Sequence, residues 1–438
     1  MTTDSNNPHS LKKLAVVGSA WITLGYGVSQ LLRFGSNLIL THLLAPNYFG
    51  IMAIVNVFMI GLAMFSDVGI GPSIIQHERG ADRDFLDTAW TIQVIRGVAI
   101  WCCCLIGAWP FSNFYGEPLL MWLIPVAGLS AVISGFNSTG IFTADRNLSL
   151  GYLTIIEIGS QIVAIVLMMI IAYLTPSVWV LVYGGLVSAF VKMVSSHVWL
   201  ANVRDRFYWD RNSARELIKF GRWIFVSTML SFFMNSSGSL ILGKFMNMTE
   251  LGLFSIAATL SKIVEQIYQQ ISSKILFPVF SKSKHLPLND FRERIKKIRL
   301  IIMLVFLPPL WIMVIYGQRI VDLLFDPRYH DAGWILSVYA GGFIPIMIAG
   351  LGPFYLAMGN SSLLMKVTAA KFIFYVGSMI AGWYLYGTNG IIYGMAFSNF
   401  LAYALDAYLQ RIYGVWIAKL DLLGIASSLF VIGLGLYL

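Results

Sequence analysis

Residues 37–54 read NLILTHLLAPNYFGIMAI, and residues 239–256 read SLILGKFMNMTELGLFSI. Aligned at an offset of 202, the two stretches share Leu38/Leu240, Ile39/Ile241, Leu40/Leu242, Gly50/Gly252 and Ile54/Ile256. Each stretch holds the end of one apolar run, a short turn and the start of the next run. The same letters in the same context predict that the chain contains two copies of one unit.

Further matches follow in the same order along the chain. Asn147/Asn360, Ser149/Ser362 and Leu150/Leu363 agree at an offset of 213, and Tyr183–Gly184 matches Tyr393–Gly394 at an offset of 210. With six helices, an even number, both copies start on the same side of a membrane. Parallel repeats of this kind are related by an axis along the membrane normal, with a binding site between them near the midplane.

The composition is that of a membrane protein. Of the 438 residues, 58% are hydrophobic and 12% are charged, against about 45–50% and about 25% in soluble domains. The apolar runs are roughly 18–25 residues long, enough to cross the bilayer as helices. The sequence predicts an all-α polytopic protein with helices at 15–41, 48–66, 89–109, 119–142, 152–174, 178–200, 222–243, 250–279, 298–316, 332–358, 363–386 and 390–410, and a last apolar run at 421–438.

These runs divide the chain into three parts. We expect an N-terminal six-helix bundle over 1–221, a C-terminal six-helix bundle over 222–410, and a linker with a partial or extra transmembrane segment over 411–438. The last run ends at Leu438, so either it is a half-span or the chain is truncated. Lys12 and Lys13 precede a run too long for a signal peptide, and we expect it to stay as the first helix.

The basic residues indicate the orientation. With the N-terminus in the cytoplasm, 21 of the 30 Lys and Arg residues fall in inner segments, and only Lys244, Arg319 and Arg328 fall in outer ones. Cytoplasmic loops of membrane proteins carry this excess. The net charge of +9 is therefore assigned to membrane topology and not to nucleic-acid binding. Cys102, Cys103 and Cys104 lie inside an apolar run and are expected to be packing residues.

One long stretch carries a family resemblance. Residues 43–76 read LLAPNYFGIMAIVNVFMIGLAMFSDVGIGPSIIQ, with Ala45–Pro46, Phe49–Gly50, Asp67–Val68–Gly69 and Gln76 at the characteristic places. This stretch resembles the second-helix signature of Wzx-type polysaccharide flippases in the multidrug/oligosaccharidyl-lipid/polysaccharide (MOP) exporter superfamily. Residues 317–336, GQRIVDLLFDPRYHDAGWIL, are similar to the family's connector between its ninth and tenth helices, although Asp326 stands where Gly is common.

The resemblance covers residues 10–410 and implies a MOP/MATE-like fold with two bundles. It also implies a carrier that turns an undecaprenyl-diphosphate-linked oligosaccharide from the inner to the outer leaflet of a bacterial inner membrane. Such a carrier serves surface polysaccharide assembly, such as lipopolysaccharide or exopolysaccharide. Its partners would be the lipid-linked substrate, the bilayer and, as an open question, the polysaccharide polymerase machinery.

Charged residues inside predicted helices are the site candidates. A charge in a span costs about 2.5–3.5 kcal/mol on insertion scales, so it usually faces a cavity or a partner. Arg33 lies in the outer half of the first helix, and the i, i+3, i+4 spacing places Tyr26, Ser29, Gln30, Arg33, Ser36 and Asn37 on one polar stripe. Arg would suit phosphate oxygens of the implied substrate. The alternative is hydrogen bonding between helices of one bundle.

Other candidates are weighed in the same way. Asn235 is the counterpart of Arg33 at the 202 offset, and Arg96 either pairs with Asp67 or lines the cavity. Glu157 and Lys192 either line it or extend to the membrane surface. Lys262 and Glu265, three residues apart, either line it or neutralise each other. The predicted substrate-binding residues are Gln30, Arg33, Asn37, Arg96, Glu157, Asn235, Lys262 and Glu265.

Two other functions stay open. One is a drug or cation antiporter of the same superfamily, although such exporters favour acidic cavities and here the mid-membrane charges are mostly basic. The other is a membrane polysaccharide polymerase or ligase, which would need a sizeable outer loop. Residues 317–331, the longest expected outer loop, are short for that role, so we expect no enzyme and no catalytic residue. No nucleotide motif, metal-ligand spacing or cofactor motif is present, so we expect no metal, no cofactor and no ATP.

Overall fold

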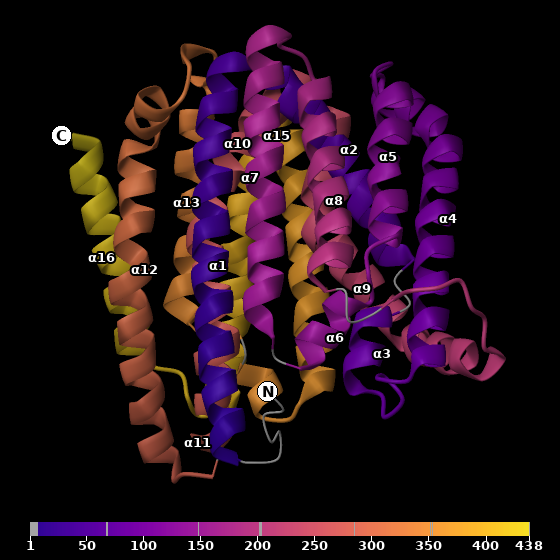
Figure 1. Cartoon of the computed structure of the whole chain (residues 1–438). Coiled ribbons are helices and arrows are strands. Elements are labelled where there is room, and N and C mark those ends of the chain that lie inside the picture. Colours follow the sequence, from indigo (N-terminus) through magenta and orange to yellow (C-terminus); the bar gives the residue numbers. More distant parts are fainter. Residues whose placement is uncertain are drawn as a thin grey trace. The chain divides into compact units, whose positions relative to one another are not determined.

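The computed structural model describes residues 8–66, 69–147, 149–200, 204–283, 285–350, 352 and 354–437. In parts of α1 (Pro8–Leu43) and α9 (Arg211–Phe245), and at a few other helical positions, it describes the backbone alone. Every regular element in these ranges is a helix (Figure 1), which confirms the predicted all-α fold. Contacts within the chain divide it into an N-terminal unit, Met1–Leu240, and a C-terminal unit, Ile241–Leu438.

Seven helices of the described chain are long and apolar enough to cross a membrane. They are α2 (Pro46–Phe65), α4 (Arg83–Tyr115), α7 (Leu150–Leu174), α8 (Trp179–Trp199), α12 (Leu288–Leu324), the segment Ala332–Ala357 and α15 (Ser361–Ile412). An eighth span would be the pair α5 (Leu120–Gly135) and α6 (Gly140–Arg146), which is bent by 60°. The protein is therefore a multi-pass membrane protein.

Broken helices recur at the same places in the element order. In the N-terminal unit α2, the second predicted helix, is followed after a break by the short helix α3 (Ile70–Gln76), and the fourth predicted helix is divided into α5 and α6. In the C-terminal unit a π-helical turn at Ser272–Leu276 joins α10 (Met248–Ile271) to α11 (Phe277–Ser283), and Gly350 ends α13 (Ala332–Ala349) before α14 (Phe354–Ala357). The common order supports duplication, which stays a prediction, as does the division of the sequence into three parts.

Four helices begin several residues earlier than predicted, and two of them are α1, at Pro8, and α4, at Arg83. α9 begins at Arg211 and α12 at Leu288, so the expected inner loops 201–221 and 281–297 are partly helical. The first turns of α12 are amphipathic, with Phe291 and Ile295 buried between charged residues. Apolar positions four residues apart form a helix face even where the charge content suggests a loop.

The remaining predicted helices correspond closely to observed ones. The predicted helices 363–386 and 390–410 are the two arms of α15, which bends at Tyr386–Gly387, and Gly387 has a positive φ of 62° that favours glycine. A 3₁₀ turn, Pro327–Tyr329, precedes α13. The last apolar run forms α16 (Ala418–Tyr437), a helix of 20 residues.

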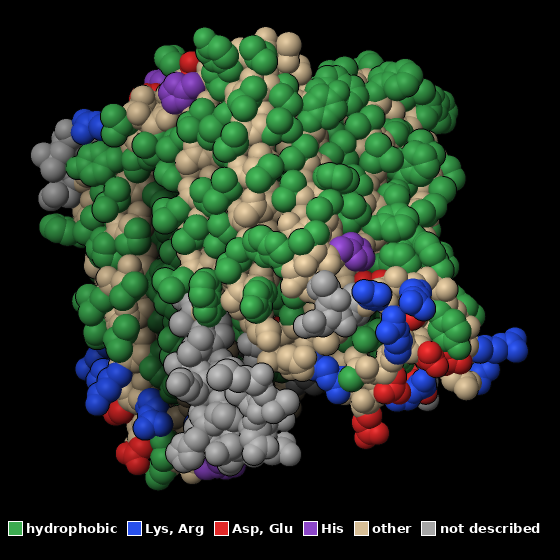
Figure 2. All heavy atoms as spheres, in the orientation of Figure 1, with side chains coloured by type: hydrophobic (Ala, Val, Ile, Leu, Met, Phe, Trp, Pro, Cys, Tyr) green, Lys and Arg blue, Asp and Glu red, His purple; other side chains and the backbone are tan. Residues whose placement is uncertain are grey.

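Each unit has its own core and its own charged end. In the N-terminal unit, Ile70, Ile74, Phe85 and Leu217 form a buried cluster where α3, α4 and α9 begin. Figure 2 shows hydrophobic side chains along the visible sides of the helices, with charged side chains gathered near α3 and near the start of α12. This distribution fits helices whose sides face lipid and whose ends face water.

Candidate functional site

A polar track runs along the packed helices α1, α7 and α8 of the N-terminal unit. We define it as Ser29 and Arg33 on α1, Glu157 and Gln161 on α7, and Lys192 on α8. The Ser29 hydroxyl donates to Gln161 Oε1 at 2.7 Å, and Gln161 Nε2 donates back to the Ser29 carbonyl at 3.2 Å. This reciprocal pair satisfies two polar side chains inside an apolar helix pair, as the alternative of bonding within one bundle proposed.

A glycine allows α1 and α7 to pack this closely. A Cβ added at Gly25 would lie 2.3 Å from Thr154 Cγ2, so a larger residue there would push the helices apart. Gly25 lies about one turn before Ser29, and Thr154 lies about two turns before Gln161. The close approach therefore holds the two polar side chains within hydrogen-bonding distance.

The charged end of the track joins α7 to α8. Glu157 precedes Gln161 by one helical turn, and its carboxylate accepts a hydrogen bond from Lys192 Nζ at 2.5 Å. Both side chains are partly exposed, with 49% of Glu157 and 36% of Lys192 accessible. Each of the two therefore has a charged partner on the neighbouring helix, a pairing that the sequence alone did not identify.

Arg33 lies at the opposite end of the track, one turn beyond Ser29. Its side chain is exposed, and within the described part of the chain nothing forms an ion pair or hydrogen bond with its guanidinium. Gln30 and Asn37 beside it are half-buried, and Gln30 Nε2 donates to the Tyr26 hydroxyl at 2.8 Å. The structure thus confirms that these residues share a region of α1, whereas cavity lining stays a prediction.

Arg96 stabilises the break after α2. Its Nε donates to Ser66 Oγ at 3.0 Å, and its Nη2 donates to the Ala63 carbonyl at 2.6 Å. The last turn of a helix has unpaired carbonyls and a partial negative charge, which a guanidinium neutralises. Asp67, the predicted partner of Arg96, lies outside the described residues. The observed contacts make Arg96 a residue that positions the helix break.

The remaining candidates lie on α9 and α10. The side chain of Asn235 is outside the described residues, so its predicted role stays untested. Lys262 and Glu265 are both half-buried, and no ion pair within 4.0 Å joins them in the described chain. The ionisable groups that act electrostatically on Glu265 are Lys262, Tyr339 and Tyr375. Lys262 is thus close enough to attract the Glu265 carboxylate without touching it.

Loops at one end of the N-terminal unit are joined by a separate charged network. The Arg79 guanidinium contacts Asp82 at 3.2 Å, Glu216 at 3.3 Å and Asp210 at 3.9 Å. The hydrogen bond with Asp82 raises the pKa of Arg79, and hydrogen bonds from Ser213 lower the pKa of Asp210. These exposed groups connect the loop before α4 to the start of α9 and need no ligand to explain them.

Sequence reasoning missed a buried charge cluster in the C-terminal unit. Arg299, counted above among the inner-segment charges, is in fact fully buried in α12. It forms an ion pair with Asp421 of α16 and donates to the Ile348 carbonyl at 2.6 Å and to Gln410 Oε1 at 3.3 Å. The signal was its place in the sequence, four residues after Ile295 and thus on the buried face of the amphipathic start of α12.

Asp421 is fully satisfied as well. Besides Arg299, it accepts hydrogen bonds from the Tyr403 hydroxyl at 2.7 Å and from Trp416 Nε1 at 2.8 Å. The Arg299–Asp421 cluster therefore joins α12, α13, α15 and α16 through groups that are buried and bonded to one another.

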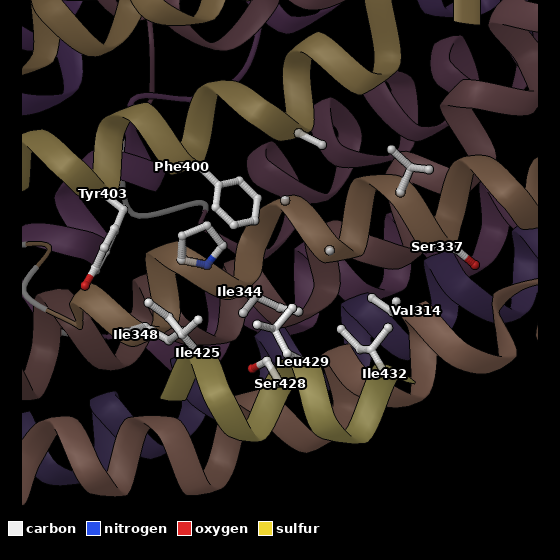
Figure 3. A pocket seen from close by; sticks show the side chains of 15 residues that line it. Val314, Ser337, Ile344, Ile348, Phe400, Tyr403, Ile425, Ser428, Leu429 and Ile432 are labelled. Atoms are coloured by element: carbon white, nitrogen blue, oxygen red, sulfur yellow. The ribbon is translucent and has the colours of Figure 1, made fainter. Parts of the chain in front are cut away.

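Next to this cluster lies an apolar pocket of about 540 Å³ (Figure 3). It is lined by α12, α13, α15 and α16, with Phe400 and Tyr403 across from Ile348 and Ile425. Its polar groups are few, and the Tyr403 hydroxyl is already bound to Asp421. Such a lining suits hydrocarbon and does not suit a charged sugar headgroup. Separately, no group of three or more His, Cys, Asp or Glu residues in the described chain could hold a metal ion.

The fold is that of solved transporters of the MOP superfamily. An inward-facing multidrug resistance MATE family transporter of that superfamily aligns with a TM-score of 0.67 and 16% identity, over 90% of this chain and 95% of that chain. Lipid II flippase MurJ in an inward closed conformation aligns with a TM-score of 0.70 and 11% identity, over 96% and 92%. At these identities the likeness defines the fold alone.

The sequence comparison then defines the family. The protein-family model described as "Polysaccharide biosynthesis protein" matches residues 39–333, and the chain belongs to this family. A Klebsiella pneumoniae protein, "Uncharacterized membrane protein in cps region", is 22% identical over 84% of this chain and 76% of the relative. The Erwinia amylovora "Amylovoran biosynthesis protein AmsL" is 24% identical over 61% and 69%. The predicted resemblance to polysaccharide exporters of the MOP superfamily is confirmed.

A third relative carries a transport description. The "Succinoglycan biosynthesis transport protein ExoT" of Rhizobium meliloti (strain 1021) is 20% identical over 58% of this chain, which spans about half of that relative's length (51%). The family and the apolar helices together make this chain a membrane protein of polysaccharide biosynthesis.

Proposed function

We propose that this protein translocates an undecaprenyl-diphosphate-linked oligosaccharide from the inner to the outer leaflet of the bacterial inner membrane. The observation that carries the proposal is the polar track, with two basic groups and one acidic group, inside a transporter of the polysaccharide biosynthesis family. Basic groups there suit the diphosphate of a lipid-linked sugar. The named relatives work in polysaccharide synthesis, and a solved structure of similar fold is a lipid flippase.

In this proposal the track receives the headgroup while the polyprenyl tail stays in lipid. Arg33 supplies a guanidinium without a partner among the described residues, and its planar fork suits two phosphate oxygens. Alternating exposure of the track to the two faces of the membrane then moves the headgroup across, with the N-terminus in the cytoplasm. Gln30, Asn37, Asn235, Lys262 and Glu265 are proposed to line the same route.

A vesicle assay tests the proposal. Purified protein is reconstituted with a labelled polyprenyl-diphosphate oligosaccharide, and an added glycosidase reports how much label is on the accessible side. We expect label to move across in protein-containing vesicles and to stay in protein-free ones. Equal distributions in both would contradict the proposal.

The MATE-like fold makes a drug or cation antiporter the second candidate. A cationic drug would need acidic groups, and the track holds Arg33 and Lys192 against Glu157 alone. Drug-sensitivity profiling of a deletion strain separates the two functions, because a flippase deletion alters surface polysaccharide and leaves drug tolerance unchanged. A polymerase deletion would instead leave single sugar repeats on the surface.

A further inference from the structure

Two lysine–carboxylate pairs join matching helices in the two units. In the N-terminal unit, Lys192 of α8 bonds to Glu157 of α7 at 2.5 Å. In the C-terminal unit, Lys371 on the first arm of α15 bonds to Asp406 on the second arm at 2.6 Å. These are the fifth and sixth predicted helices of each half, so the pairs occupy corresponding hairpins.

A glycine contact fixes the register of both hairpins. A Cβ at Gly184 would lie 2.1 Å from Met168 Sδ, and a Cβ at Gly394 would lie 2.1 Å from the Ser378 carbonyl oxygen. Gly394 follows Gly184 by 210 residues, and Ser378 follows Met168 by the same 210. Aligned positions therefore meet in both hairpins, through the Met168 side chain in one and the Ser378 backbone in the other, and they serve as a common reference point.

Measured from this contact, the two pairs lie at the same level with their charges exchanged between helices. Lys192 comes eight residues after Gly184, and Lys371 comes seven before Ser378. Both lysines are therefore about 11 Å along the helix from the contact. The carboxylates lie one turn further, since Glu157 precedes Met168 by eleven residues and Asp406 follows Gly394 by twelve. Each pair thus lies at about the same distance from its glycine contact. The lysine is on the second helix of the N-terminal hairpin and on the first arm of the C-terminal one.

Both lysines keep donors in reserve. An ammonium group has three N–H donors, and in the described chain Lys192 contacts Glu157 alone and Lys371 contacts Asp406 alone. About a third of each lysine side chain is exposed, 36% and 35%. The Arg299–Asp421 cluster, in which Arg299 is fully buried and both carboxylate oxygens of Asp421 accept hydrogen bonds, shows what a purely structural pair looks like in the same protein.

We propose that the two pairs are equivalent anion-receiving sites, one in each unit, in which the lysine binds phosphate oxygens. The source of the phosphate, a lipid-linked diphosphate, rests on the proposed function. The carboxylate orients the ammonium while the site is empty and repels the anion once it is bound, which weakens binding and favours release. Removing the lysine charge must therefore weaken anion binding, whereas removing the carboxylate charge must strengthen it.

The test is a binding measurement on the full chain in nanodiscs of neutral phosphatidylcholine, with geranylgeranyl diphosphate as the probe. We expect Lys192→Met and Lys371→Met each to weaken binding by roughly tenfold, the loss of one charge-assisted contact. Glu157→Gln and Asp406→Asn should tighten it several-fold by removing like-charge repulsion. Lys366→Met, on the same arm of α15 and exposed, is the matched control and should leave affinity unchanged.

Two outcomes would overturn the inference. Unchanged affinity in both lysine variants would exclude the ammonium groups, and weaker binding in the lysine and carboxylate variants alike would indicate a purely structural link between helices. Thermal unfolding of each variant, and of the double variant Lys371→Met/Asp406→Asn, separates lost binding from lost folding. Even if the single lysine variants unfold, the carboxylate variants still show whether removing the negative charge strengthens or weakens binding of the probe.

Further arms separate the phosphate sources and the two proposals. Pyrophosphate, and nanodiscs containing phosphatidylglycerol, show whether a free phosphate or a phospholipid headgroup competes with the probe. If wild-type protein transfers the lipid-linked sugar and the lysine variants bind and transfer equally well, this inference fails and the proposed function stands. If the lysines bind the probe but no lipid-linked sugar is transferred, the sites stand and the proposed function fails.

Discussion

The polar track and the Arg299–Asp421 cluster use the same chemistry to different ends. Both place a cationic side chain and a carboxylate between apolar helices. At the cluster, Arg299 is fully buried, and Asp421 accepts hydrogen bonds from Arg299, Tyr403 and Trp416. Along the track, Arg33 is exposed without a partner in the described chain and Lys192 uses one donor of three. Whether a charge between helices serves structure or ligand binding thus depends on its burial and on how many of its hydrogen bonds the protein already fills.

The largest expected effect comes from removing a partner within the Arg299–Asp421 cluster. Asp421→Ala leaves Arg299 buried without its counter-charge, and removing one partner of a buried pair costs about 3–5 kcal/mol. We expect a much lower melting temperature in detergent. The double variant Arg299→Met/Asp421→Leu removes both charges and should unfold near the wild-type temperature. An Asp421→Ala protein as stable as wild type would mean that Arg299 is not buried as described.

Arg33→Ala tests the polar track, the other region in this comparison. Because no described group depends on this guanidinium, the melting temperature should stay within a degree or so of wild type. Transfer of the lipid-linked sugar in vesicles should fall by roughly tenfold or more, since a bidentate phosphate contact is lost. Arg319→Ala, at the far end of α12, is the control. Normal transfer by Arg33→Ala would remove this residue from the site.

Ser29→Ala sharpens the comparison at the neutral part of the track. Hydrogen bonds between membrane helices average about 0.6 kcal/mol, so we expect a small loss of stability. The same loss should occur in Gln161→Leu and should not add in the double variant, because both remove one interaction. Ser195→Ala on α8, a serine with no described hydrogen bond, serves as the control in the same thermal unfolding measurement. Fully additive losses would indicate that the two side chains act independently.

The smallest effect concerns pH at the exposed loop network. Hydrogen bonds from Ser213 lower the pKa of Asp210 below its ordinary value of 3.8 in the folded protein. The charged form therefore stabilises the folded loop above pH 3.8, and this contribution disappears as the pH falls through the lower folded pKa. Hydrogen exchange of residues 204–216 at pH 3 and pH 6 should show that loss in wild type. Asp210→Asn should exchange at rates that differ less between the two pH values.

Much of the fold could be predicted from the sequence because the length and hydropathy of apolar runs identify membrane helices. Each predicted helix has an observed counterpart, and the glycine at Gly387 marks the turn inside α15. The starts of α9 and α12 were missed because their charged residues resemble a loop until the apolar spacing is counted. Whether a helix runs on past its apolar stretch depends on what its first turns pack against, which hydropathy does not contain.

The site was predictable in part for the same reason. The polar stripe around Arg33 is a pattern within one helix, so spacing alone found it. The partners Gln161 and Lys192 lie on other helices, and pairing them needs tertiary structure. Arg299 was misplaced because a charge near a loop is normally solvated, and only the packing of α16 over α12 shows otherwise.

The separation of Arg299 from Asp421 has a consequence for how the protein is made. The two residues are 122 positions apart, so at about 5–20 residues per second the arginine waits roughly 6–24 seconds for its carboxylate during synthesis. Until α16 emerges, the ninth predicted helix carries an uncompensated charge that favours the bilayer surface over its interior. The described part of the C-terminal unit can therefore reach its final packing only after translation has passed Asp421 and α16 has packed against α12.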